Sequence, residues 1–195
     1  MKILAQKAER HVLTITVDNE SGVLAKITGL FSARGYNIES LTVADISADH
    51  ALSRITIVTN GPPPVIDQII AQLDRLVPVH NVTDLTDAGA HVERELALVK
   101  VAGTGDKRIE ALRLADVFRA KVVDTTLTSF IFEITGTSEK VDSFVGLMRE
   151  CGLVEVGRTG VVAIARVPGE LVSSPGLTPG PAWRYRFPVF WPRLR

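Results

Sequence analysis

The chain has 195 residues, of which 46% are hydrophobic, and its 22 basic and 22 acidic residues give a formal net charge of +0. This composition is typical of a folded globular protein, and the balanced charge argues against nucleic acid or an anionic membrane as a partner. The single cysteine, Cys151, excludes an internal disulfide. No apolar run has the length of a signal peptide or a membrane span, so we expect a cytoplasmic protein with a reduced, buried thiol.

The first half of the chain predicts the element order β-α-β-β-α-β. Residues 11–18 (HVLTITVD) alternate bulky apolar with polar side chains, which indicates a half-buried strand. Apolar residues then recur at steps of three and four, which predicts one face of a helix, at Val23, Leu24, Ile27, Leu30 and Phe31. Further strands are expected over residues 38–46, 51–59 and 77–85, with a second helix that turns Val65, Ile66, Ile69, Ile70 and Leu73 inward.

This order is that of the ferredoxin-like unit, an antiparallel four-stranded sheet with both helices on one face. The first and third strands are central in that arrangement, and the second and fourth lie at the edges. Pro78 in the fourth strand agrees with an edge position, because proline has no N–H to donate to a neighbouring strand.

The second half repeats the order of elements without repeating the sequence. We expect strands over residues 95–103, 121–127 and 130–136, and a closing strand over 155–166 in which Gly157 and Gly160 indicate a bulge. One helix over residues 106–118 should turn Ile109, Leu112, Ala115 and Val117 inward, and another, capped by Ser138, should bury Val141, Phe144, Val145 and Met148.

The fold class predicted is therefore α+β, with two tandem ferredoxin-like βαββαβ domains. The domains are expected at residues 11–86 and 93–166, joined by a short linker. Residues 167–195 hold most of the prolines and both tryptophans and show no period, so we expect them to form an irregular C-terminal tail.

The junction between the first strand and the first helix is the strongest candidate for a ligand site. Asn19 and Ser21 are good N-cap residues, and Gly22 allows a sharp turn into the helix. A helix N-terminus presents unpaired N–H groups and a partial positive charge, so the carboxylate of an amino acid fits there. From these residues alone, a structural turn without a ligand stays open, because most such helix starts bind nothing.

Patterns that would indicate catalysis or metal binding are weak. His11, His50, His80 and His91 lack the spacing of metal ligands, so we expect no metal site. Residues 103–108 (GTGDKR) lack the G-K-[ST] ending of a phosphate-binding loop. RNA recognition is disfavoured because the expected central strands lack the aromatic side chains that stack on bases.

Residues 18–44 (DNESGVLAKITGLFSARGYNIESLTVA) closely resemble the start of the small, regulatory subunit of acetolactate synthase, also called acetohydroxyacid synthase. Residues 52–57 (LSRITI), 91–95 (HVERE) and 154–162 (VEVGRTGVV) resemble the same family, in collinear order. The resemblance runs from about residue 11 to residue 166 and does not include the tail. It implies that the first domain is an ACT domain, a ferredoxin-like module that binds amino acids.

The resemblance also implies a role. The small subunits of this family have no active site and no cofactor of their own. They join a large catalytic subunit, which holds thiamine diphosphate, magnesium and FAD and condenses two pyruvates, or pyruvate with 2-ketobutyrate. They raise its activity and make it sensitive to feedback inhibition by valine, and in some members by leucine or isoleucine, in branched-chain amino acid biosynthesis.

Effector sites in the family lie between two ACT domains that pair through edge strands in a homodimer. By motif matching, the loop and helix start that receive the effector carboxylate are Asn19, Ser21, Gly22, Val23 and Leu24. Asn37 and Ile38 of the facing chain would meet the ammonium group and the side chain. The alternative is a free-standing ACT-domain sensor that uses the same site to regulate another enzyme.

Overall fold

The computed structural model describes residues 8–166. The tail predicted over residues 167–195 lies outside the described residues. Among the described residues, no helix combines the length and the apolar character needed to cross a membrane.

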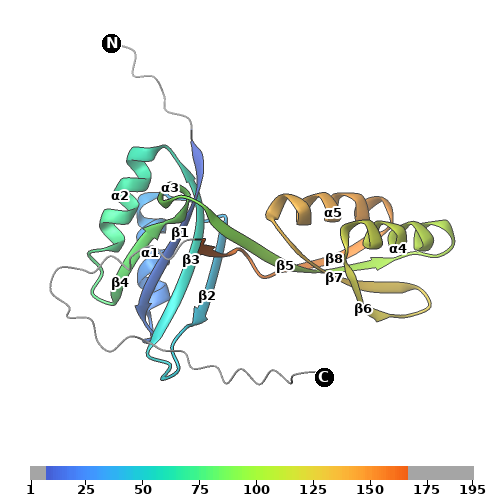
Figure 1. The fold of residues 1–195 in the computed structure, drawn as a ribbon, viewed down its shortest axis with the longest axis horizontal. Helices are drawn as coiled ribbons and strands as arrows, with labels where there is room; N and C mark the ends of the chain where they lie inside the picture. Colours follow the sequence, from blue (N-terminus) through green and yellow to red (C-terminus); the bar gives the residue numbers. More distant parts are fainter. Residues whose placement is uncertain (1–7, 167–195) are drawn as a thin grey trace, which may run out of the picture.

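The first unit is a four-stranded antiparallel sheet with two helices on one face (Figure 1). Its strand order is β2-β3-β1-β4, so the first and third strands are central, as predicted. Pro78 lies just before the edge strand β4, and its carbonyl accepts a hydrogen bond from the Asp18 amide at 2.8 Å. The elements are β1 (Glu9–Asp18), α1 (Val23–Arg34), β2 (Ser40–Asp45), β3 (Leu52–Gly61), α2 (Pro63–Leu73) and β4 (Val79–Asp84).

The core of this unit lies between the sheet and the two helices. The predicted helix faces are largely confirmed, but Leu24 is 37% exposed because it lies beside the buried stripe of α1. The core is mainly aliphatic, with one aromatic pair in which Phe31 meets Tyr36 edge to face. Its fully or nearly buried members are Leu13, Ile15, Val17, Val23, Ile27, Phe31, Ile55, Ile57, Ile66, Ile69 and Leu73.

The second unit has the same topology, with strand order β6-β7-β5-β8. Phe144 contacts the rings of Phe118 and Phe132 in its core, and Phe132 also contacts Phe130. Cys151 is buried and free, as predicted, and burial raises the pKa of its thiol. The elements are β5 (His91–Ala102), α4 (Asp106–Phe118), β6 (Lys121–Thr125), β7 (Ser129–Gly136), α5 (Ser138–Glu150) and β8 (Leu153–Arg158).

Two sequence predictions for helices of the second unit are wrong in part. Helix α4 buries Ala115, as predicted, but its other buried residue is Ala111, while Ile109, Leu112 and Val117 are exposed. The small alanines allow the helix backbone to lie close to the core, and this packing outweighs the alternative apolar stripe. The N-cap of α5 is Thr137, whose side chain accepts from the Lys140 amide, and Ser138 is already helical.

The two units are joined by a pair of strands and not by a loose linker. Residues 85–88 form a short helix, α3 (Leu85–Ala88), and β5 starts at His91, four residues earlier than predicted. The single closing strand predicted over residues 155–166 is wrong, because the chain leaves the sheet after Arg158 and pairs again as β9 (Val162–Ala165). Strand β9 pairs with residues 91–94 of β5, which runs as one long strand from the first unit to the second (Figure 1).

The joining strands cover part of the helix-free face of the first sheet. Val161 and Ala163 are buried there against Val12 and Val58 of the sheet and Leu85 of α3. Arg10 of β1 forms an ion pair with Glu93 of β5, with 2.9 Å between the charged atoms. Residues 159–161, which separate β8 from β9, therefore lie against the first unit. One continuous strand would instead have stayed in the second sheet.

Candidate functional site

The start of helix α1 is formed by a backbone turn and not by a capping side chain. Gly22 is the N-cap residue, at φ 88° and ψ −4°, a left-handed conformation that glycine adopts without strain. Asn19 and Ser21 do not cap the helix, contrary to the prediction. The Asn19 side chain instead donates to the His50 carbonyl at 2.9 Å, and the Asn19 amide donates to the Ala51 carbonyl at 2.8 Å. These two bonds hold the loop against the β2–β3 turn.

The first turn of α1 keeps its anion-binding capacity. Among residues 8–166, the Leu24 and Ala25 amides find no acceptor, and there is no acidic side chain in this turn. A Cβ built on Gly22 would meet nothing within 4 Å, so the approach is open. Free amides and the helix dipole together favour a small anion such as a carboxylate at this position.

The acids nearest in sequence to this helix start are paired. Glu20 forms an ion pair with Lys26 at 2.9 Å, and Asp18 contacts His80 at 2.6 Å. The Glu20 charge is thus offset by Lys26, which lessens its repulsion of an incoming carboxylate, and Asp18 is engaged in a hydrogen bond with His80.

Helices α2 and α5 do not offer the same chemistry. Helix α2 begins with Pro63 and Pro64, which have no N–H groups, and the next two amides both bond the Pro62 carbonyl. Helix α5 is capped by the Thr137 side chain and has Glu139 in its first turn.

Asn37 and Ile38 lie beyond the other end of α1. Asn37 is exposed, and its carbonyl accepts from the Thr59 hydroxyl at 2.6 Å, while Ile38 packs partly into the core. Helix α1 has 12 residues. At a rise of 1.5 Å per residue its two ends are ~18 Å apart. One chain therefore does not bring the Gly22 loop and the Asn37 segment together.

Strand β2, which follows Asn37 and Ile38, has a free outer edge. Among the described strands it pairs with β3 alone, in antiparallel register from Ser40 opposite Val58 to Asp45 opposite Ser53. The end of β2 lies near the start of α1, because Asn19 bonds the turn that follows β2. This open edge can accept a further strand.

The structure brings together one group of possible metal ligands that the sequence prediction missed. Ligand atoms of His11, Asp84 and Asp87 lie within 4.8 Å of one another. His11 Nδ1 contacts Asp84 Oδ2 at 2.6 Å, and both residues are buried. Asp84 also accepts from the Thr86 amide at the start of α3, so the pair fastens α3 to β1. Since His11 and Asp84 are 73 residues apart, no local spacing could have indicated this contact.

The other histidines make separate contacts. His50 hydrogen-bonds Asp45, which lowers the pKa of that carboxyl, and His91 contacts the Gly89 carbonyl. His80 contacts Asp18, as described above.

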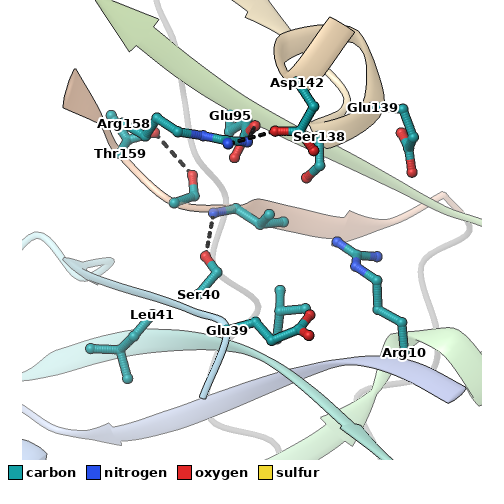
Figure 2. Close-up of a pocket in the computed structure, with 13 residues that line it drawn as sticks. Arg10, Glu39, Ser40, Leu41, Glu95, Ser138, Glu139, Asp142, Arg158 and Thr159 are labelled. Atoms are coloured by element: carbon teal, nitrogen blue, oxygen red, sulfur yellow. Dashed lines mark hydrogen bonds and ion pairs between the residues drawn. The ribbon is translucent and has the colours of Figure 1, made fainter. Parts of the chain in front are cut away.

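A cavity of about 620 Å³ lies where the two units meet (Figure 2). Arg158 on one wall contacts Glu95 and lies 2.6 Å from Asp142. Ser40 of β2 lies on the opposite wall, and its hydroxyl accepts a hydrogen bond from the Val161 amide in the segment that follows Arg158. The charged groups of this wall, Arg158, Glu95 and Asp142, form ion pairs with one another. We therefore interpret the cavity as part of the contact between the two units.

Comparisons with known proteins agree with the resemblance read from the sequence. A family model described as "AHAS small subunit-like ACT domain" matches residues 13–81, and one described as "Small subunit of acetolactate synthase" matches residues 94–167. The chain belongs to the acetolactate synthase small-subunit family. Its first unit is thus an ACT domain, and the predicted fold of two tandem ferredoxin-like domains is confirmed.

Individual members of the family match over most or nearly all of their length. The acetolactate synthase isozyme 3 small subunit of Escherichia coli K12 is 46% identical over 158 residues, which cover 80% of this chain and 96% of that protein. The small subunit of Aquifex aeolicus is 42% identical over 161 residues, or 82% of this chain and 83% of that protein. The crystal structure of the Thermotoga maritima small subunit has a TM-score of 0.74 at 38% identity and covers 82% of this chain and 98% of that one.

Proposed function

We propose that this chain is the non-catalytic, regulatory subunit of an acetolactate synthase. It binds the large catalytic subunit, raises its activity and makes it subject to feedback inhibition by a branched-chain amino acid, foremost valine. Thiamine diphosphate, magnesium and FAD belong to the catalytic subunit in this proposal, and the small subunit contributes no reacting group.

The observation that carries the proposal is the open start of helix α1. The Leu24 and Ala25 amides lack acceptors among residues 8–166, and Gly22 leaves the approach clear. Hydrogen bonds to a charged group are each worth about 1.5–3 kcal/mol, so two amides can hold an effector carboxylate without a basic side chain.

A homodimer completes the site in this proposal. The end of β2 lies near the start of α1, while Asn37 and Ile38 precede the beginning of β2. Antiparallel pairing of two β2 edges about a two-fold axis would place the beginning of one β2 beside the end of the other. Asn37 of one protomer would then face the Gly22 loop of its partner, and its side-chain amide would receive the ammonium group.

The apolar wall of the site favours a small branched side chain. Leu24 is 37% exposed, and Ile38 is partly exposed, so both offer apolar surface to a ligand. One methylene changes the binding free energy by only about 1–3 kcal/mol, which leaves leucine and isoleucine as weaker effectors.

Effector binding across the dimer would act on the catalytic subunit through dimer geometry. If the catalytic subunit prefers one arrangement of the two ACT domains and the effector another, the two binding events are coupled, typically by about 1–3 kcal/mol.

Mixing the purified chain with an acetolactate synthase catalytic subunit tests the proposal. Acetolactate formation should rise when the chain is added and fall again with valine, while the chain alone should form none. A catalytic subunit whose rate is unchanged by the chain, at concentrations where a complex is seen by size exclusion, would contradict the regulatory role.

A further inference from the structure

The segment between β8 and β9 is the point where the second domain contacts the strand that begins at the proposed effector site. The Val161 amide donates to the Ser40 hydroxyl at 2.8 Å (Figure 2). The Thr42 hydroxyl donates to the Val161 carbonyl at 3.0 Å. Ser40 and Thr42 both lie on β2. The contact is therefore specific, with two polar side chains of the ACT domain holding the backbone N–H and C=O of one residue of the joining segment.

Gly160 allows this close approach. It has φ +86°, and a Cβ at this position would lie 2.8 Å from the Ser40 hydroxyl, 2.9 Å from the Thr42 hydroxyl and 3.3 Å from the Leu41 carbonyl. Any residue other than glycine would come too close to the edge strand and would strain the left-handed backbone. It would fit here only if the segment moved away from β2.

The same segment is fastened to the second domain on its other side. The Thr159 amide donates to the Leu96 carbonyl at 3.0 Å, and the Leu96 amide donates to the Thr159 hydroxyl at 3.1 Å. Arg158 adds its ion pairs with Glu95 and Asp142. A shift of residues 159–161 would therefore also displace β5, which carries Glu95 and Leu96, and α5, which carries Asp142.

In the ACT domain, the first residue that contacts Val161 through a hydrogen bond is Ser40, two residues after Ile38. The backbone between Asn37 and Ser40 is tied to β3 through the Asn37 carbonyl, bound by Thr59, and the Glu39 amide, bound to Val58. Val58 itself packs against Val161. Any movement that an effector causes at Asn37 and Ile38 therefore reaches Ser40 and Val161 through packed and hydrogen-bonded groups.

We propose that the contact of Gly160 and Val161 with Ser40 and Thr42 transmits effector binding from the ACT domain to the second domain, with Gly160 as its positioning residue. This inference rests on the proposed function, because it presupposes an effector at the start of β2. Substitution at Gly160 should weaken inhibition of the catalytic subunit by valine and leave valine binding intact, since Gly160 belongs to the contact with Ser40 and Thr42 and not to the effector site.

The test compares Gly160→Ala with wild type in the complex with the catalytic subunit. Valine affinity, measured by calorimetry, should stay within about threefold of wild type, while the valine concentration for half inhibition rises at least about fivefold, the lower end of typical allosteric coupling. Gly157→Ala is the matched control, because a Cβ at Gly157 meets nothing within 4 Å and its φ is not positive. That variant should be inhibited like wild type.

A gentler variant covers the case in which Gly160→Ala does not fold, as judged by circular dichroism. Ser40→Ala removes the bond to the Val161 amide without strain and should raise the half-inhibiting concentration in the same direction, by a smaller factor. Wild-type inhibition in both variants would overturn the inference, and so would a parallel loss of valine binding, since the contact would then be part of the site. A wild-type chain that neither binds valine nor transmits inhibition would instead overturn the proposed function.

Discussion

The two domains share a topology but differ at the start of their first helix. Helices α1 and α4 both follow the first strand of a unit, and neither has a side-chain cap. Helix α4 has Asp106 in its first turn, so a negative charge of the chain itself lies near the positive end of the helix dipole and disfavours a further anion there. Helix α1 has no acid there. The same fold therefore favours an anion at the start of α1 and disfavours one at the start of α4.

The cores of the two domains differ as well. The ACT core is mainly aliphatic, whereas in the second domain Phe144 packs between Phe118 and Phe132, and Phe132 also contacts Phe130. The second domain also leaves Ile109, Leu112 and Val117 exposed on α4. The comparison supports the proposal that an effector binds the first domain, in which the local chemistry of the helix start, and not the shared fold, carries the function.

The largest expected effect is on the stability of the second domain. Phe144→Ala should lower the free energy of unfolding by about 3–5 kcal/mol, because Phe144 is fully buried between two other phenylalanines. Chemical denaturation followed by circular dichroism measures the change. Leu147→Ala on the same helix, at 44% exposure, is the control and should cost far less. A loss below about 1 kcal/mol for Phe144→Ala would mean that the aromatic cluster does not hold this domain together.

Gly22→Asp tests the open helix start directly. It adds a carboxylate where the effector carboxylate should bind, so the half-inhibiting valine concentration should rise roughly 100-fold, the equivalent of one or two lost charged hydrogen bonds. Activation of the catalytic subunit should persist. Gly22→Asn separates charge from backbone strain, since asparagine also tolerates positive φ.

Gly29→Asp is the positional control for that variant. It adds the same charge to α1 at an exposed glycine about two turns from the helix start, where a Cβ meets nothing within 4 Å. Inhibition of Gly22→Asp enzyme at wild-type valine concentrations would refute the site. Equal effects at positions 22 and 29 would show a long-range charge effect and not a local one.

The smallest expected effect is that of Asp106→Asn, which tests the comparison of the two helix starts in the second domain. Asp106→Asn should lower stability by only about 0.3–1 kcal/mol, because it removes one favourable charge from the first turn of α4. Valine inhibition should be unchanged. A second valine bound per chain in this variant would show that the acid alone distinguishes the two helix starts.

The sequence predicted the elements whose patterns are long and regular. The strand order, the edge position of the fourth strand and the inward face of α5 agree with the predictions from hydrophobic period and turn residues, although Pro78 lies just before β4 and not within it. The family resemblance carried by residues 18–44 and three shorter segments was likewise sufficient to identify the family. These features depend on local sequence alone.

The errors occurred where a distant partner decides the outcome. Helix α4 has two apolar stripes, and packing against the core of the second domain selects the alanine stripe over that of Ile109 and Leu112. Gly160 was read as a bulge because the sequence does not show that Ser40 and Thr42, about 120 residues earlier, lie against it. Asn19 has the chemistry of an N-cap, but His50 and Ala51 bind it instead.

Calorimetric titration of the folded chain with valine tests the central claim most directly. The account predicts saturable binding of one valine per chain by a dimer, and its loss in the Gly22→Asp variant. A folded, dimeric sample that gives no heat with valine, leucine or isoleucine at several temperatures would contradict it.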